Sequence, residues 1–475
     1  MILRHKLAEV FSVLPALILL NALLFIAISK AGIGLSIDSI NYFSAAQNWV
    51  DGHGLVLFDG SKLVNAAPLY SFLMAPAYFF KLDAMLYAAC LQFIFLNLNA
   101  IAIYLILQTL VDAKRILWLY LCILLLNYFT FVQVSVWALS EMGFVCLFAC
   151  WLYFILCKPN VRWAPALLFG ALCLQRYLFW YFVPGIILYW FWRKRNVKGL
   201  LIQLVFGVVF TSTWLLRNYV VQGSLLGSHQ LEEKFSIGAF FENAVQLING
   251  IGSLDPLYAG PAFFLISIWF LSLGFRNETG IRRECSLLLL LVAGGLLFFL
   301  LLQPNLQMSQ LPRYLSVLYV FIYISWILLL ERIIHRNWLK FSLGGFVLAI
   351  STILLINKAL EFKQKGLGIK STLAFWVDLE NVALAKYPDL PMLSNFPDVV
   401  WLKTGKTCGY LPFLNEDYDA FSKRTPAGLY QVIWFKDSSR EMLMNEAVLN
   451  ENADFTPLYN GHWHKIGTLK LGSAY

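Results

Sequence analysis

Long apolar runs recur through the first 357 residues of this chain and leave little polar surface between them. Eleven candidate runs lie at about 10–29, 84–108, 116–133, 139–157, 164–175, 177–192, 199–219, 257–275, 286–303, 314–330 and 341–357. About 20 apolar residues suffice to cross a bilayer as a helix. Only 13% of the 475 residues are charged, against roughly 25% in soluble proteins. The pattern predicts an α-helical polytopic membrane protein with about 11 transmembrane helices. It excludes cytosolic, disordered and fibrous proteins.

The basic residues favour one orientation in the membrane. With the N-terminus inside, the predicted cytoplasmic segments are 1–8, 112–115, 158–162, 193–198, 276–285 and 331–340. They hold 16 Lys and Arg residues, whereas the predicted outer side of the membrane body holds 7. Loops rich in Lys and Arg stay in the cytoplasm. Eleven spans then predict a C-terminal tail outside. The net charge of +9 therefore reflects topology and not nucleic-acid binding.

Two of the runs, on either side of Arg176, are short for a membrane crossing. Reading them as one helix would turn the cluster Arg193-Lys194-Arg195 outward, so the charge pattern favours two helices. The first run is long for a signal peptide and lacks a clean cleavage site, which predicts an uncleaved first span.

Three segments are more polar than the runs. A first outside loop, about 30–83, contains an amphipathic stretch, Leu69–Phe80, that predicts a helix lying at the membrane surface. A second outside loop covers about 220–256. Residues 358–475 have an ordinary composition with six prolines, which predicts a small soluble α/β domain with β-type runs at Asp398–Leu402 and Leu429–Phe435. The predicted domains are therefore 1–357 and 358–475.

Asp38 is the first candidate for chemistry. If the stretch after it is helical, Tyr42, Ala45 and Ala46 share its face, and the glycines at 52 and 54 end the helix. A carboxylate at the lipid–water boundary can accept a proton from an incoming hydroxyl. The alternative is that Asp38 only caps the N-terminus of this helix.

Three arginines lie at predicted outer ends of spans, against the general bias: Arg176, Arg217 and Arg313. The planar guanidinium suits a phosphate, such as that of a lipid carrier. The alternatives are snorkelling to lipid headgroups or pairing with an acid such as Glu141, which begins a span. An acid within a membrane is costly and often functional, although a helix N-terminus also stabilises it.

The sequence does not indicate a metal or a disulfide framework. The eight cysteines form no CxxC pair. No second acid accompanies Asp38, and the histidines predicted outside lack a third ligand nearby; they are His53, His229, His462 and His464. The phosphate-binding and hydrolase motifs built on glycine-rich loops do not occur in a credible context.

The ordered motifs resemble the GT-C superfamily of polytopic glycosyltransferases, in particular bacterial family-39-like and dolichyl-phosphate-mannose-mannosyltransferase-like members. Five segments carry the resemblance: Asp38…Tyr42…Ala46…Gly52-His53-Gly54, Ala67-Pro68-Leu69-Tyr70, Ser140-Glu141, Trp214-Leu-Leu-Arg217-Asn218-Tyr219 with Gly223 and Gly227, and Arg313-Tyr314-Leu315. Two departures stand out. Ala67 replaces a proline of many relatives, and the missing second acid disfavours a metal-dependent variant.

The resemblance implies a multi-pass protein of the bacterial cytoplasmic membrane that uses a polyprenyl-phosphate sugar on the outer face. Asp38 corresponds to the general base, and transfer usually inverts the anomeric carbon. Arg217 and Arg313, with Arg176, are the candidates for binding the donor phosphate; supporting residues are Tyr42, His53, Glu141 and Tyr314. No cofactor is required, and the acceptor is a glycan, lipid or protein bound by the tail and the 220–256 loop.

Two other classes compete with this prediction. A transporter or flippase for lipid-linked sugars would place ionisable residues near the membrane midplane and show paired repeats, neither of which the sequence contains. A catalytically inactive sensor or assembly subunit is the other alternative, and only the residues around Asp38 argue against it.

Overall fold

The computed structural model describes residues 2–112, 116–193, 197–225, 240–245, 260–302, 311–369, 390–411, 427–435, 454–460 and 464–471, together with residues 238, 421 and 425. The chain forms two compact units. The first contains Met1–Ile33, Val64–Leu73 and Leu82–Gln364. The second contains Gly34–Leu63, Met74–Lys81 and Lys365–Tyr475.

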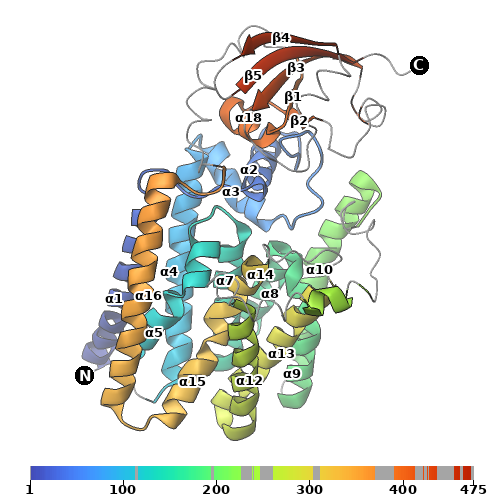
Figure 1. Cartoon of the computed structure of the whole chain (residues 1–475). Coiled ribbons are helices and arrows are strands. Elements are labelled where there is room, and N and C mark those ends of the chain that lie inside the picture. The colour runs from blue at the N-terminus through green and yellow to red at the C-terminus, as the bar shows by residue number, and fades with distance from the viewer. Residues whose placement is uncertain are drawn as a thin grey trace. The chain divides into compact units, whose positions relative to one another are not determined.

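Helices make up the first unit (Figure 1). They are α1 (Ile2–Ile28), α4 (Ala84–Leu110), α5 (Leu117–Leu125), α6 (Tyr128–Thr130), α7 (Ser140–Cys157), α8 (Trp163–Gln175), α9 (Val183–Arg193), α10 (Val197–Gln222), α12 (Gly260–Asn277), α13 (Gly280–Leu302), α14 (Leu311–Ile322), α15 (Ile324–Ile333) and α16 (Asn337–Lys365, whose last residue belongs to the second unit). A π-helical turn covers Phe131–Ser135, and a 3₁₀ turn covers Tyr177–Tyr181.

Within the described residues, five helices are long and apolar enough to cross a membrane: α4, α7, α10, α13 and α16. Shorter apolar helices accompany them, including α8. The predicted class of α-helical, multi-pass membrane protein is therefore confirmed. The number of eleven spans stays a prediction.

Two predicted runs are not continuous helices. The run at 116–133 divides into α5, α6 and the π-helical turn, and the run at 314–330 divides into α14 and α15 at Tyr323. Asn127 explains the first break, because its Oδ1 accepts the backbone N–H of Thr130 at 3.3 Å. A side-chain acceptor of this kind starts a new helix.

The two short runs beside Arg176 are separate helices, as predicted. α8 ends at Gln175, and Arg176 is extended, with φ −154° and ψ 132°. The 3₁₀ turn follows and leads into α9. The extended residue turns the chain, so the Arg176 side chain leaves the end of α8 and not its lateral face.

Small residues let neighbouring helices of this unit approach closely. α8 packs against α7 and α10, and α4 packs against α7. A Cβ on Gly207 of α10 would come within 2.7 Å of the Phe169 ring of α8. Glycine at such a position allows the backbones of membrane helices to come together.

The second unit carries a five-stranded sheet with the order β2-β1-β3-β5-β4. The strands are β1 (Met392–Ser394), β2 (Cys408–Tyr410), β3 (Gly428–Phe435), β4 (Asp454–Asn460) and β5 (His464–Leu471). β1 pairs in parallel with β2 and β3, whereas β5 pairs antiparallel with β3 and β4. Tyr430, Val432 and Trp434 lie in one core cluster, and Ile433 and Phe435 lie in another. This alternation is that of a sheet covered on both faces, and it confirms the small α/β domain.

One predicted strand in this domain is wrong. Residues 397–404 form a helix, α18 (Pro397–Thr404), where the sequence suggested a strand at Asp398–Leu402. Pro397 occupies the first turn, where its fixed φ suits a helix, and Asp398 stands where the helix dipole favours an acid. The helix ends at Gly405 with φ 68°.

Two parts of the first outside loop, Gly34–Leu63 and Met74–Lys81, fold together with the tail in this second unit. Leu35 forms a parallel bridge to Gly368, and Cys408 N–H donates to the Phe58 carbonyl at 3.0 Å. The helix that carries Asp38, α2 (Ile37–Val50), packs against α18. The amphipathic stretch forms α3 (Leu69–Phe79), close to its predicted bounds.

Candidate functional site

Glu141 is the most deeply buried acid of the first unit that the structure describes. It stands in the first turn of α7, and its side chain is 0% exposed. An ionised carboxylate removed from water needs opposite charges or hydrogen bonds to compensate for lost hydration.

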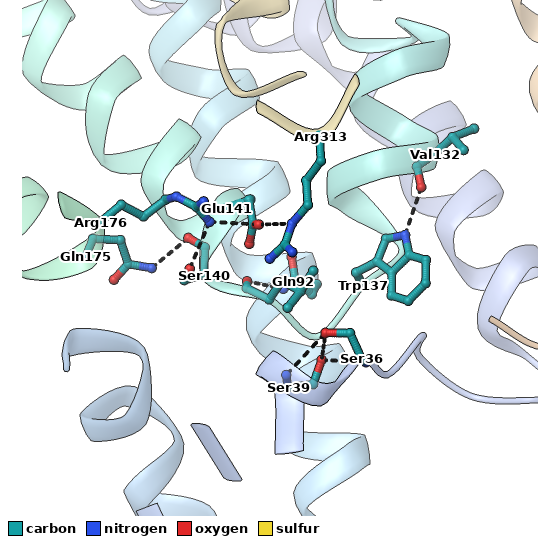
Figure 2. Close-up of polar contacts among 11 residues, drawn as sticks. Ser36, Ser39, Gln92, Val132, Trp137, Ser140, Glu141, Gln175, Arg176 and Arg313 are labelled. Atoms are coloured by element: carbon teal, nitrogen blue, oxygen red, sulfur yellow. Dashed lines mark hydrogen bonds and ion pairs between the residues drawn. The ribbon is translucent and has the colours of Figure 1, made fainter. Parts of the chain in front are cut away.

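Two arginines supply this compensation from different parts of the chain (Figure 2). Arg176 Nη1 lies 2.7 Å from Glu141 Oε1, and Arg313 Nε lies 2.6 Å from the same oxygen. Arg176 comes from the end of α8 and Arg313 from the first turn of α14. The cluster carries one negative and two positive charges, so it has an excess positive charge available to an anion.

Both guanidinium groups retain access to solvent. The side chains of Arg176 and Arg313 are 16% and 32% exposed, whereas Glu141 is enclosed. Glu141 Oε2 is buried and has no hydrogen-bond partner among the described residues. The geometry suits two arginines that a buried acid holds in place and whose outer faces bind an anion.

Polar side chains from α4 and α8 support the start of α7. Arg176 Nη1 also donates to Ser140 Oγ at 3.2 Å, and Gln175 Nε2 donates to the Ser140 carbonyl at 2.8 Å. Gln92 Nε2 donates to the Leu139 carbonyl at 3.3 Å (Figure 2). These bonds fix the backbone that carries Glu141.

Gly143 makes room for one of these supports. A Cβ at position 143 would come within 2.6 Å of Gln175 Nε2. A side chain at this position would displace the end of Gln175, so glycine favours the close approach of Gln175 to the first turn of α7.

Arg217 belongs to a second cluster. Its guanidinium lies 4.8 Å from the centre of the Trp214 ring, and its Nη1 donates to Asn218 Oδ1 at 3.0 Å. Trp214 Nε1 donates to the Tyr177 hydroxyl at 2.5 Å. Because Tyr177 follows Arg176 directly, the turn after α8 connects this cluster to the one around Glu141.

This second cluster also binds the backbone just before the Ala67-Pro68 segment. The Tyr177 hydroxyl and Asn218 Nδ2 each donate to the Val64 carbonyl at 3.4 Å. Three segments far apart in sequence therefore meet here: Val64, which shortly precedes Ala67-Pro68, the turn after Arg176, and the Trp214–Asn218 stretch of α10.

An apolar cavity of about 410 Å³ lies beside Tyr177. It is lined by the 3₁₀ turn, by α10 and by Phe299 of α13; the residues are Tyr177, Leu178, Trp180, Tyr181, Val208, Thr211, Ser212, Leu215 and Phe299. Its volume falls within the range of small-molecule sites.

Two known structures are similar to this arrangement over almost its whole length. The crystal structure of ArnT from Cupriavidus metallidurans bound to undecaprenyl phosphate matches with a TM-score of 0.61 and 12% identity, covering 97% of each chain. Its apo state matches with a TM-score of 0.58 and 11% identity, covering 97% of this chain and 98% of that chain. The chain has the GT-C fold of ArnT.

The resemblance to the GT-C superfamily is thus confirmed for the fold. No protein-family profile and no curated protein match the chain.

Asp38 lies in α2 of the second unit, in the first turn of that helix. The N-cap is Ser36, whose side chain forms a capping box with Ser39 (Figure 2). The alternative that Asp38 itself caps the helix is therefore wrong. Tyr42, Ala45 and Ala46 are buried, as expected for one packed face.

The remaining predicted residues fall into different surroundings. His53 is exposed just after α2, and Gly52 and Gly54 have the positive φ values expected after a helix end. Tyr314 follows Arg313, and its ring lies 5.5 Å from that of Phe299.

Among the described residues, no group of three His, Cys, Asp or Glu side chains is placed to hold a metal. His229 and His462 lie outside these residues.

Sequence reasoning missed Gln92, Gln175 and Tyr177. Gln92 and Gln175 are fully buried amides in apolar runs. A buried amide needs hydrogen-bond partners. A glutamine within an apolar run therefore indicates a polar contact between helices. The identity of those partners depends on contacts between helices.

Proposed function

We propose that this protein is a membrane glycosyltransferase that moves a sugar from a polyprenyl-phosphate donor to a hydroxyl group of an acceptor. The observation that carries the proposal is the convergence of Arg176 and Arg313 on the buried Glu141. The GT-C fold supports it, since an ArnT structure with this fold is bound to undecaprenyl phosphate.

The chemistry explains why paired arginines are useful. The donor is a phosphodiester with one negative charge. When the acceptor oxygen bonds to the anomeric carbon, the bond from that carbon to the phosphate oxygen breaks, and polyprenyl phosphate leaves with an additional negative charge. Positive groups already held in position stabilise charge that develops in the transition state. Arg176 and Arg313 supply this charge, with Arg217 as the third candidate.

The proton of the acceptor hydroxyl needs a base, and we assign this role to Asp38. Transfer then occurs in one displacement with inversion at the anomeric carbon. Tyr42 and His53 support Asp38 from the same segment, and Glu141 and Tyr314 support the arginines. The reaction requires no metal in this scheme.

The apolar cavity beside Tyr177 suits the hydrocarbon part of the carrier next to its phosphate. We assign the reaction to the outer face of a bacterial cytoplasmic membrane. The tail and the 220–256 loop then bind the acceptor, which is a glycan, lipid or protein.

A direct test uses the purified full chain in lipid nanodiscs with a panel of radiolabelled polyprenyl-phosphate sugars and membrane extracts as acceptors. We expect one donor to yield a labelled product and free polyprenyl phosphate. Movement of the donor between leaflets with no covalent product would instead identify a flippase.

A further inference from the structure

Asn218 is a fully buried amide whose hydrogen bonds join three segments of the first unit. Its Oδ1 accepts from Arg217 Nη1 at 3.0 Å. Its Nδ2 donates to the Val64 carbonyl at 3.4 Å and to the Leu225 carbonyl at 3.2 Å. A buried amide with partners on both its oxygen and its nitrogen is fixed in one orientation. The oxygen of Asn218 therefore stays turned toward Arg217.

The end of α10 explains how Asn218 reaches two loops. α10 ends at Gln222, and Gly223 follows with φ 71°. Glycine adopts this left-handed conformation readily, and it turns the chain back at the end of a helix. The carbonyl of Leu225 thereby comes within reach of the Asn218 amide. Asn218 thus ties the first outside loop, at Val64, to the start of the second outside loop.

Trp214 holds the same guanidinium by a different interaction. It lies one turn before Arg217 on the same face of α10, and the guanidinium lies 4.8 Å from the centre of its ring. The ring is itself fixed, because Trp214 is buried and its Nε1 donates to the Tyr177 hydroxyl at 2.5 Å. That hydroxyl donates in turn to the Val64 carbonyl, which Asn218 also binds. The two residues that hold Arg217 are therefore connected to each other through Tyr177 and Val64.

Such a support is useful at a site that binds charge. A free arginine side chain occupies many rotamers, and ordering it on binding reduces the affinity. A positive group that is fixed before the ligand arrives avoids this cost. Arg217 is only partly buried, whereas Trp214 and Asn218 are buried. The arginine can therefore meet a ligand that its supports do not touch.

We propose that Asn218 is a positioning residue for the donor phosphate. Together with Trp214, it holds the Arg217 guanidinium in the orientation that binds the phosphate of the polyprenyl carrier. Tyr177 keeps this arrangement in place, and Asn218 itself does not touch the donor. This inference rests on the proposed transferase function, in which Arg217 is the third candidate for binding this phosphate.

The experiment measures binding of radiolabelled undecaprenyl phosphate, and of uncharged undecaprenol, to the full-length protein in detergent. We expect Asn218→Ala to weaken binding of undecaprenyl phosphate about tenfold, because Arg217 loses a hydrogen bond that holds it. Binding of undecaprenol should not change. Tyr177→Phe keeps the ring and should weaken binding of undecaprenyl phosphate about threefold. A general defect in the fold would instead lower the affinity for both lipids.

A double-mutant cycle shows whether Asn218 acts through Arg217. Arg217→Gln should weaken binding of undecaprenyl phosphate about tenfold or more. Adding Asn218→Ala to Arg217→Gln should then change the affinity less than about twofold, because the group that Asn218 positions is already lost.

The matched control is Asn97→Ala, which removes an amide with the same number of hydrogen bonds. Asn97 Nδ2 donates to Asn21 Oδ1 and to the Phe93 carbonyl, and Asn97 Oδ1 accepts from Asn21. None of these bonds involves an arginine, so Asn97→Ala should bind both lipids like the wild type. Unfolding temperatures without lipid show whether each variant is folded.

The results separate this inference from the proposed function. Equal affinity of the wild type for the two lipids would overturn both, because the phosphate would then not be recognised. If the wild type prefers undecaprenyl phosphate, wild-type affinity in folded Asn218→Ala would overturn only the positioning role. The same conclusion would follow from an equal loss of undecaprenol binding in Asn218→Ala, or from additive losses in the double variant.

Discussion

Glu141 shows how a single residue places a strong constraint on its surroundings. A fully buried carboxylate at the start of an apolar helix is tolerated because two guanidinium groups meet one of its oxygens. The sequence marked all three residues as candidates but left open whether the arginines pair with Glu141. Their separation explains this, since Arg313 lies 172 residues after Glu141.

Replacement of Glu141 by glutamine tests this pairing. The amide has the same size but no charge, so both arginines lose their counter-charge. Breaking a buried ion pair costs about 3 kcal/mol or more. We expect a loss of this order in the free energy of unfolding, measured by denaturant titration in detergent. The triple variant Glu141→Gln, Arg176→Gln, Arg313→Gln should lose much less than the sum of the single changes. Additive losses would contradict the coupling.

Asp38 gives the most direct test of the proposed chemistry. Removal of a general base lowers the rate by about 10²–10⁴-fold, and Asp38→Asn should lower kcat by this amount with normal expression. The matched control is Asp51→Asn at the other end of α2, where Asp51 is exposed and forms the C-cap through its backbone. Unchanged turnover in Asp38→Asn would remove Asp38 from the reaction.

At the scale of elements, breaks in helices position the candidate site. The extended conformation of Arg176 ends α8 and sends its side chain to Glu141, while Tyr177 in the next turn reaches Trp214. The sequence predicted this break from charge placement. It did not predict the break at Asn127, because a single asparagine lowers the mean hydropathy of a long apolar run too little to divide it.

α8, which ends at one of these breaks, packs closely against α10. The substitution Gly207→Ala tests the importance of this close packing. The added Cβ would lie 2.7 Å from the Phe169 ring, so the helices must separate or the ring must move. Overpacking of this kind costs about 1–3 kcal/mol. Thermal unfolding should show a lower midpoint for Gly207→Ala. Gly294→Ala is the control, because its Cβ would meet no atom within 4 Å; an equal loss in both variants would contradict the packing argument.

At the scale of the whole molecule, the proposed reaction at the outer face depends on which side of the membrane each part of the chain occupies. The positive charges predict the C-terminal tail outside and the segment 331–340 inside. Single cysteines in a cysteine-free variant test this with a membrane-impermeant maleimide. Lys406→Cys, which is exposed in the tail, should react in intact cells. Arg336→Cys should react only after the membrane is opened. Reaction of position 406 only from the inside would contradict the proposed outer-face reaction.

The sequence by itself determined the class of protein, the positions of most helices, the break at Arg176 and the resemblance to GT-C enzymes. These follow from local properties, because a bilayer demands apolar helices of a given length and loops of a given charge. Only the tertiary structure decided that Arg176 and Arg313 share Glu141, that Tyr177, Trp214 and Val64 meet, and that residues 34–63 fold with the tail. Such contacts join segments many residues apart, and they depend on how side chains pack and on which partners satisfy buried polar groups.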